Sequence, residues 1–211
     1  MPWSHHRAAV APLRRIVLIL LLALCAVPAA GATPGVVVRI NGTPVVERAG
    51  KSRALRPADA VATGDVIVTD AAAKVKLLLA DDSVLTIGPR SRVVLDELVL
   101  SAVNRAVKLG VLVGRFKIAI AKFFGRSSEY QVRTPTAVAG MRGTVVWGDT
   151  TLDAICALDG HVEVRALAGS GAPAQLAAGE CVSQMAAGKT TPLTPSATDL
   201  AAYLKEVTLD D

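Results

Sequence analysis

The fold is decided by one stretch in the first half of the chain, residues 74–95, which reads KVKLLLADDSVLTIGPRSRVVL. It contains three short apolar runs, separated by Asp81-Asp82-Ser83 and by Gly88-Pro89. The first run opens with basic and apolar residues in alternation, which is the period of a β-strand with one buried face. Turn-forming residues at such short intervals leave no room for a helix, so this stretch predicts three consecutive strands.

Similar apolar runs continue on both sides of this stretch. They recur about every 8–12 residues, with Gly, Pro, Asp and Ser between them. The further strands that we predict cover residues 36–40, 66–69, 115–120, 130–133, 144–147, 154–158 and 161–164. This spacing predicts an all-β protein, with a single sandwich- or solenoid-like β domain. Asn41-Gly42 fits both a glycosylation sequon and a hairpin turn, and we favour the hairpin.

The composition excludes several classes of protein. The chain has 211 residues, of which 52% are hydrophobic, so there is enough apolar material for a core and no reason to expect intrinsic disorder. No apolar run reaches the roughly 20 residues of a membrane-spanning helix. Three cysteines and three histidines form no zinc motif and no catalytic triad. We therefore predict that the protein is not an enzyme and that it binds no metal or cofactor.

The N-terminus has the three parts of a secretory signal peptide. Residues 1–15 contain three arginines and no acidic residue, residues 16–27 are apolar, and small residues follow up to Ala32. We predict cleavage after Ala32 and a periplasmic or secreted mature protein. An uncleaved membrane anchor and a lipoprotein modified at Cys25 are the alternatives, but the apolar run is short and Leu24 is bulky. Cleavage would leave 20 basic and 18 acidic residues, so we expect no nucleic-acid partner.

Cys156 and Cys181 are the two cysteines that remain after the predicted cleavage. An even pair of cysteines in an exported protein usually forms a disulfide, which we predict here. Two free buried thiols are the alternative.

Residues 105–126 are strongly basic, with six cations and no acidic residue. Alternation over residues 115–120 favours a strand pair with a solvated basic face, to which we assign Arg115, Lys117 and Lys122. A basic amphipathic helix is the alternative, although Gly110 and Gly114 weaken it. Either arrangement would permit peripheral binding to a membrane or an anionic polymer without spanning the membrane.

The C-terminal part, residues 188–211, is predicted to be a linker and a short helix. Ser196 is a suitable N-cap, with Asp199 three residues later. Leu200, Tyr203, Leu204 and Val207 recur at helical spacing, and we expect this apolar stripe to pack on the β domain.

Several segments, taken together, resemble the FecR-like domain family, the periplasmic part of iron(III)-dicitrate-type regulators. The most specific is residues 132–144, Val-Arg-Thr-Pro-Thr-Ala-Val-Ala-Gly-Met-Arg-Gly-Thr. The others are residues 64–69, 79–87, 158–164 and 176–180, in the order that the family has. Asp82 departs from the family pattern, which usually has glycine in that turn.

The resemblance implies an all-β domain, here residues 33–187, that has no known catalytic activity and contacts other proteins in the cell envelope. Full-length regulators of the family carry a sigma-factor-binding segment and a membrane span before this domain. We recognise neither here, so we do not expect direct control of a sigma factor. We predict an exported, non-enzymatic domain for protein–protein interaction or signalling, with β-strand addition at a sheet edge as its binding mode. An enzyme that uses Asp81 or Glu163 is a third hypothesis.

The signature residues Thr134, Pro135, Gly140, Arg142, Gly143 and Thr144 have two interpretations. In the structural one, which we favour, the guanidinium of Arg142 is held against carbonyl oxygens or a carboxylate and locks a turn. Arg142→Ala should then abolish folding. In the functional one, Arg142 is presented to an acidic group of a partner.

Overall fold

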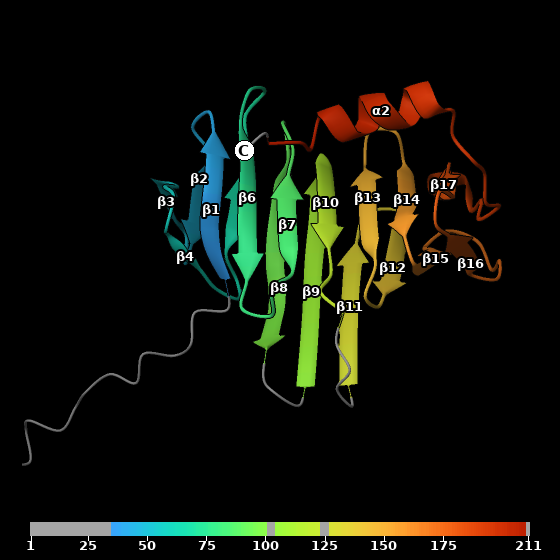
Figure 1. Ribbon diagram of the computed structural model, residues 1–211, viewed down its shortest axis with the longest axis horizontal. Coiled ribbons are helices and arrows are strands. Elements are labelled where there is room, and N and C mark those ends of the chain that lie inside the picture. The colour runs from blue at the N-terminus through green and yellow to red at the C-terminus, as the bar shows by residue number, and fades with distance from the viewer. Residues whose placement is uncertain (1–34, 101–103, 123–126, 210–211) are drawn as a thin grey trace, which may run out of the picture. The chain divides into compact units, whose positions relative to one another are not determined.

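The computed structural model describes residues 35–100, 104–122 and 127–209. The predicted signal peptide, residues 1–32, lies outside them. The described chain folds into two β-sheets and one short C-terminal helix (Figure 1), so the all-β prediction is confirmed. In this part of the chain no helix has the length and apolar character needed to cross a membrane.

Two sheets, A and B, contain eight and nine described strands. Sheet A has the order β17-β14-β13-β10-β7-β6-β1-β4, with β1 (Gly35–Asn41), β4 (Ala60–Val61), β6 (Lys74–Leu79), β7 (Val84–Ile87), β10 (Arg115–Ala119), β13 (Val145–Asp149), β14 (Ala154–Asp159) and β17 (Cys181–Ser183). Sheet B has the order β16-β15-β12-β11-β9-β8-β5-β2-β3, with β2 (Val45–Arg48), β3 (Lys51–Ala54), β5 (Val66–Val68), β8 (Arg92–Leu100), β9 (Asn104–Val113), β11 (Ser127–Arg133), β12 (Ala137–Met141), β15 (His161–Ala166) and β16 (Ala174–Ala177). A 3-10 turn, η2, covers Met185–Ala187.

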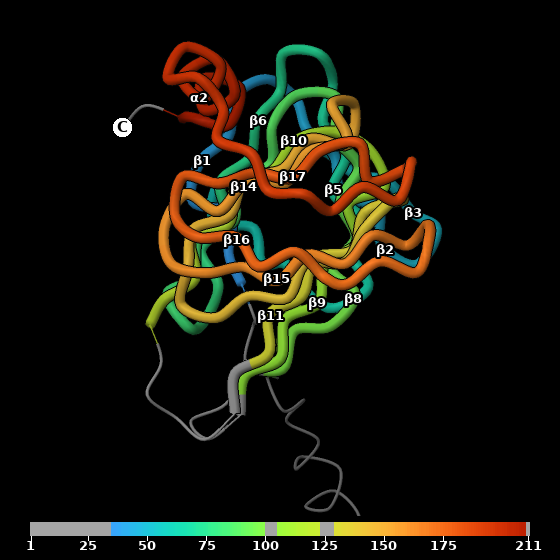
Figure 2. The backbone as a smooth tube through the Cα atoms, turned by 90° about the vertical axis from the view of Figure 1, so that its right-hand side faces the viewer, coloured from blue at the N-terminus to red at the C-terminus, as the bar shows by residue number. Residues whose placement is uncertain are grey.

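The chain alternates between the two sheets and adds its strands to both nearly in sequence order. It enters sheet A with β6 and β7, sheet B with β8 and β9, sheet A with β10, and sheet B with β11 and β12. The backbone therefore winds as a flattened coil, which Figure 2 shows from the side. Neighbouring described strands are antiparallel, apart from the parallel pair β9 and β11. The fold thus combines a sandwich of two sheets with the progressive winding of a solenoid.

Left-handed turns carry the chain from one sheet to the other. Gly114, between β9 and β10, has a φ of 102°, and Gly160, between β14 and β15, has a φ of 70°. Only glycine adopts such angles at no steric cost. The Asn41-Gly42 turn belongs to this group, because β1 lies in sheet A and β2 in sheet B. The prediction of a turn there is confirmed, but the prediction of a hairpin is wrong.

The hairpin between β6 and β7 explains the aspartate that replaces the family's usual glycine. Asp82 has a φ of 66°, a left-handed conformation that aspartate tolerates better than most side chains. Next to it, the carboxylate of Asp81 accepts hydrogen bonds from the backbone N–H and the hydroxyl of Ser83, at 3.1 and 2.9 Å. The side chain of Asp81 therefore holds this turn together.

The predicted strand pair in residues 105–126 is not formed. The two strands exist, and the alternation of buried and half-buried residues over β10 is as predicted. However, β9 lies in sheet B and β10 in sheet A, because the turn at Gly114 sends the chain across instead of back. The cations of this stretch are therefore divided between two sheets and form no single strand pair, although Arg115 and Lys117 lie on the same side of β10 as predicted.

The three residues assigned to the basic face have different environments. The Nε of Arg115 lies 2.6 Å from Oδ2 of Asp149, and its Nη1 lies 3.6 Å from Glu206. Lys117 and Lys122 form no ion pair with other described residues. Lys117 is half-buried on β10, whereas Lys122 is exposed beside Gly143.

The C-terminal helix α2 (Ala197–Lys205) begins and packs as expected. The hydroxyl of Ser196 accepts a hydrogen bond from the N–H of Asp199 at 3.1 Å, which caps the helix. Tyr203 stacks on Trp147 of β13, with ring centroids 4.6 Å apart, and Val207 beyond the helix is buried. Trp147, Cys156, Cys181 and Val207 form one buried cluster beneath the helix.

Two contacts inside this framework have large consequences for stability. Phe116 lies opposite Gly148 in the β10–β13 ladder, and its ring fills the space that a side chain at Gly148 would need. Cys156 and Cys181 lie opposite each other on β14 and β17 and form a disulfide, with their Cα atoms 3.9 Å apart. The predicted disulfide is confirmed.

Candidate functional site

The signature residues fall into two groups in the structure. Residues 132–144 form part of the hairpin β11–β12 and the turn that leads into β13. Thr134 and Pro135 lie in the hairpin turn, where the Thr134 hydroxyl accepts a hydrogen bond from the N–H of Ala137 at 3.0 Å. Gly143 has a φ of 56° in the turn after β12, and the Thr144 hydroxyl donates to the carbonyl of Asp159. These four residues shape turns.

Gly140 and Arg142 belong to the other group, because both lie on the outer face of sheet B. The backbone of Gly140 does not have a positive φ, and a Cβ added there would meet nothing within 4 Å. Neither backbone conformation nor packing therefore requires glycine at this position. Arg142 is exposed and forms no hydrogen bond or ion pair with other described residues. The guanidinium therefore locks no turn through contacts with the described residues, and that prediction is wrong.

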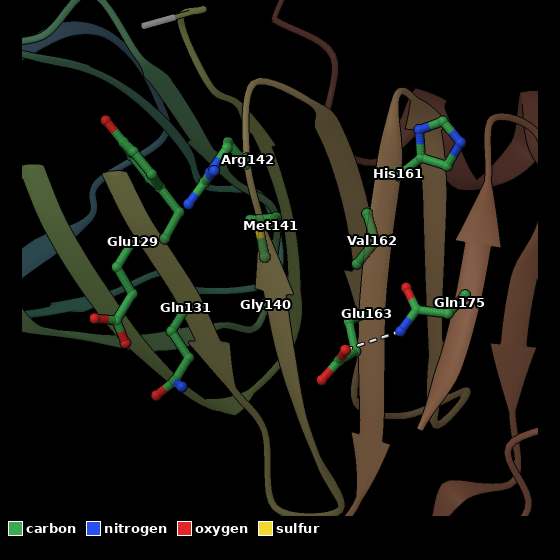
Figure 3. Close-up of a pocket in the computed structure, with 10 residues that line it drawn as sticks. Glu129, Gln131, Gly140, Met141, Arg142, His161, Val162, Glu163 and Gln175 are labelled. Atoms are coloured by element: carbon green, nitrogen blue, oxygen red, sulfur yellow. Dashed lines mark hydrogen bonds between the residues drawn. The ribbon is translucent and has the colours of Figure 1, made fainter. Parts of the chain in front are cut away.

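A hollow of about 440 Å³, the Gly140 hollow, lies above this glycine (Figure 3). In the strand registers Gly140 lies between Gln131 of β11 and Glu163 of β15, so the missing side chain leaves a gap in the sheet face. Figure 3 shows Arg142 and His161 toward one end of the hollow, and Gln131 and Glu163 flanking the glycine. Such a mixture of open space and converging polar groups is typical of a binding site.

The remaining polar groups of the Gly140 hollow are Glu129 and Gln175. The carboxylate of Glu163 accepts a hydrogen bond from Nε2 of Gln175 at 2.8 Å, which positions both side chains. Glu129 lies on β11, near enough to Lys108 to contribute to raising the pKa of that lysine, although the hydrogen bond that Lys108 donates to Glu97 is the larger cause. Arg142 lines the same hollow and forms no ion pair with a described residue, although Glu129 and Glu163 place two carboxylates there.

A second hollow of about 410 Å³, the Gly110 hollow, lies over Gly110 on the other side of β11. Its walls are largely apolar, with Leu112 and Leu167 52% and 43% exposed. The carboxylate of Asp96 lies over the glycine, since a Cβ added to Gly110 would come within 2.9 Å of Oδ2. Asp96 is exposed, but partial desolvation of its carboxylate raises its pKa, and the Arg133 guanidinium partly offsets this effect.

Asp96→Asn is expected to raise the melting temperature at pH 7 relative to the unmodified protein. Because the pKa of Asp96 is higher in the folded than in the unfolded state, the ionised carboxylate costs stability above its unfolded pKa of about 4. Below that pKa the group is protonated in both states and the cost disappears. Thermal unfolding at pH 7 and pH 3 measures this, and a stabilisation of equal size at both pH values would contradict the prediction.

Arg142→Ala is expected to leave the stability unchanged to within about 0.5 kcal/mol, because the side chain is exposed and pairs with no described residue. Arg48→Ala is the matched control. The Nε and Nη2 atoms of Arg48 each lie 2.6 Å from the carboxylate of Asp65, which is fully buried. Removal of the Arg48 side chain would leave this buried carboxylate without its cation and should clearly lower the melting temperature. Urea unfolding of both variants tests the contrast. An Arg142→Ala protein that fails to fold would restore the structural interpretation.

Asp81 and Glu163, the two carboxylates of the enzyme hypothesis, do not lie near each other in the structure. Asp81 lies in the β6–β7 turn of sheet A, whereas Glu163 lies on the outer face of sheet B. Within residues 35–100, 104–122 and 127–209, no group of three or more His, Cys, Asp or Glu side chains could hold a metal ion.

Sequence reasoning identified Gly140 and Arg142 but not the hollow that they share. Gln131, His161 and Gln175 are single outward-facing residues on three different strands, and no local motif connects them. The available signal was Gly140 itself, at a surface position of an otherwise regular strand, where glycine often marks the close approach of a ligand or another backbone.

The fold is a sandwich of two β-sheets with an open, polar hollow on one outer face. The sequence model of the FecR protein family matches residues 65–170, half of the chain. The chain belongs to the FecR protein family. This membership supports a signalling or regulatory role, and FecR domains are usually periplasmic or associated with the cell envelope.

Among solved structures, the chain is similar to a candidate anti-sigma factor from Parabacteroides distasonis, known from crystals at 1.65 and 2.50 Å resolution. Both comparisons give a TM-score of 0.51 at 17% sequence identity and cover 66% of this chain. They cover 64% and 63% of the other chain, so the likeness spans less than two thirds of that protein and shows the fold alone. No curated protein sequence matches this chain.

Proposed function

We propose that this protein is an exported signalling domain that binds a partner protein in the cell envelope through the Gly140 hollow. The observation that carries the proposal is the pair formed by Gly140 and Arg142. The glycine is required by neither conformation nor packing, and the arginine beside it presents its charge to solvent. A partner in the hollow would account for both residues, because its backbone could approach the glycine closely and its acceptor groups could bind the arginine.

The sheet edges offer less room for a partner strand than the hollow does. The edge strand β16 has four residues, and the N–H of Ala177 donates to the carboxylate of Glu180 at 2.8 Å. At the edge of sheet A, Cys181 of β17 already exchanges backbone hydrogen bonds with Leu193. The edge strand β3 carries Lys51 and Arg53, and charged residues on an edge discourage strand addition. The face of sheet B is therefore favoured over β-strand addition.

Peripheral binding to an anionic surface is not favoured either. It would need the cations of residues 105–126 on one side of the molecule, but these belong to two different sheets. Three of them are also paired, Arg105 with Asp81 at 3.8 Å, Lys108 with Glu97 at 2.8 Å and Arg115 with Asp149 at 2.6 Å.

The partner contact is tested by site-specific photo-crosslinking in cells that express the gene. A photoreactive amino acid replaces Gln131, which borders the Gly140 hollow, or Ser52, which is exposed on the distant edge strand of the same sheet. The expected result is one discrete protein adduct from position 131 and none from position 52. No adduct at position 131, or identical adducts from both positions, would overturn the proposal.

Export is tested independently of binding. Alkaline phosphatase fused after Asp211 is active only outside the cytoplasm, because its disulfides form there. We expect an active fusion, and loss of activity when residues 1–32 are deleted. A fusion that is inactive with the N-terminus present would contradict the envelope location.

A further inference from the structure

The two hollows on sheet B lie on one continuous face and together specify what kind of segment would fit it. This inference rests on the proposed function, because it identifies the chemistry of the partner. The Gly140 hollow opens between β15 and β11, and the Gly110 hollow opens on the β9 and β8 side of β11. Only the side chains of β11 separate them. A ligand on this face would therefore meet both.

The registers give the separation of the two hollows. Arg142 follows Met141, which pairs with Tyr130, whereas Gly110 pairs with Arg133. Arg142 and Gly110 are thus two strand spacings apart across the sheet, about 10 Å, and about four residues apart along β11, near 13 Å. The diagonal is about 16 Å, which an extended polypeptide covers in about five residues.

The Arg142 end offers a guanidinium that can bind a carboxylate, in a hollow that Glu129 and Glu163 also line. Arg142 has five N–H donors, none of which is used by another described residue, and His161 lies at the same end of the hollow (Figure 3). A guanidinium of this kind binds a carboxylate through two parallel hydrogen bonds. Beside it, the bare backbone of Gly140 allows a ligand main chain to approach, with the Gln131 amide within reach.

The chemistry at the other end is apolar. Leu112 and Leu167 are about half exposed, and Val94 and Pro135 add further apolar surface to the Gly110 hollow. Its polar members are Asp96, Arg133 and Thr134. Exposed aliphatic side chains around a concavity mark the binding of an apolar group, because burying them releases free energy roughly in proportion to the area removed from water. A leucine, methionine or aromatic side chain fits these walls.

We infer that the partner protein contributes an extended segment with an acidic side chain bound by Arg142 and a large apolar side chain, four to six residues away, in the Gly110 hollow. The segment runs diagonally over β12, β11 and β9. The acidic anchor sets specificity, and the apolar anchor supplies buried area.

The test uses a phage-displayed library of random 12-residue peptides selected on the immobilised full chain. We expect the enriched peptides to carry Asp or Glu four to six positions from Leu, Met, Phe or Trp. Fluorescence anisotropy with a synthetic copy of the best peptide then compares four variants. Gly140→Leu fills one hollow, Leu112→Ser weakens the other, Arg142→Glu reverses the charge, and Ser52→Leu is the control on the distant edge strand.

We expect at least tenfold weaker binding for the first three variants and an unchanged affinity for Ser52→Leu. Gly140→Leu should keep its melting temperature, because the added side chain points into open space. Selection on Arg142→Glu should favour Lys or Arg at the acidic position. This exchange of preference is not explained by damage to the fold.

The inference is overturned if enriched peptides lack the acidic residue or if the three variants bind as the unmodified protein does. A protein adduct at position 131 whose contacting segment lacks the two anchors would also overturn it, while the proposed function would stand. Absence of any adduct would instead remove the proposed function.

Discussion

Gly148→Val is expected to lower the free energy of unfolding by about 3 kcal/mol, the upper end of what overpacking a core costs. A Cβ at this position would lie 2.4 Å from Cε1 of Phe116, a fully buried residue on the neighbouring strand. Valine has the better β propensity, but that gain is at most about 1 kcal/mol and does not offset the overlap. Urea unfolding followed by circular dichroism measures the loss.

A second substitution shows whether the overlap is the cause. Phe116→Leu removes ring atoms and should itself destabilise the protein, yet in combination with Gly148→Val part of the lost stability should return. The two effects would then be strongly non-additive, as for residues in direct contact. Losses that simply add would mean that Gly148 is needed for another reason.

Removal of the disulfide is the other change with a large expected effect. The double variant Cys156→Ala/Cys181→Ala should lose about 3.5 kcal/mol, the chain-entropy value for the 25-residue separation of the two cysteines. Chemical denaturation with and without dithiothreitol measures it. The unmodified protein should become less stable when reduced, whereas the double variant should not respond. A double variant as stable as the oxidised protein would contradict the prediction.

The strands were predictable from sequence because apolar and polar residues alternate along them, which marks one face of the strand as buried. The alternation in residues 74–79 and 115–120 reappears directly in the burial of β6 and β10. The sheet to which each strand belongs was not predictable. A left-handed glycine such as Gly42 or Gly114 fits a hairpin and a crossing between sheets equally well. The distinction depends on contacts with strands that are distant in sequence.

The same limit applies to the candidate site. The signature identified Gly140 and Arg142, and spacing alone suggested that two glycines hold the arginine in a turn. The structure places Gly140 within β12, opposite Gln131 and Glu163, so its surroundings come from β11 and β15. The sequence alone does not give the registers of the strands, so it cannot show that the space above Gly140 is empty. This empty space is the observation that favours a binding surface over a structural turn.

The winding of the chain has a consequence for how such proteins diversify. Because successive strands are laid down side by side in both sheets, each turn of the coil contacts mainly the turns before and after it. Duplication or deletion of one whole turn would lengthen or shorten the domain while leaving the remaining registers intact. We expect relatives of different length to differ by whole turns, gained or lost away from β9, β11, β12 and β15, so that the proposed recognition face keeps its registers.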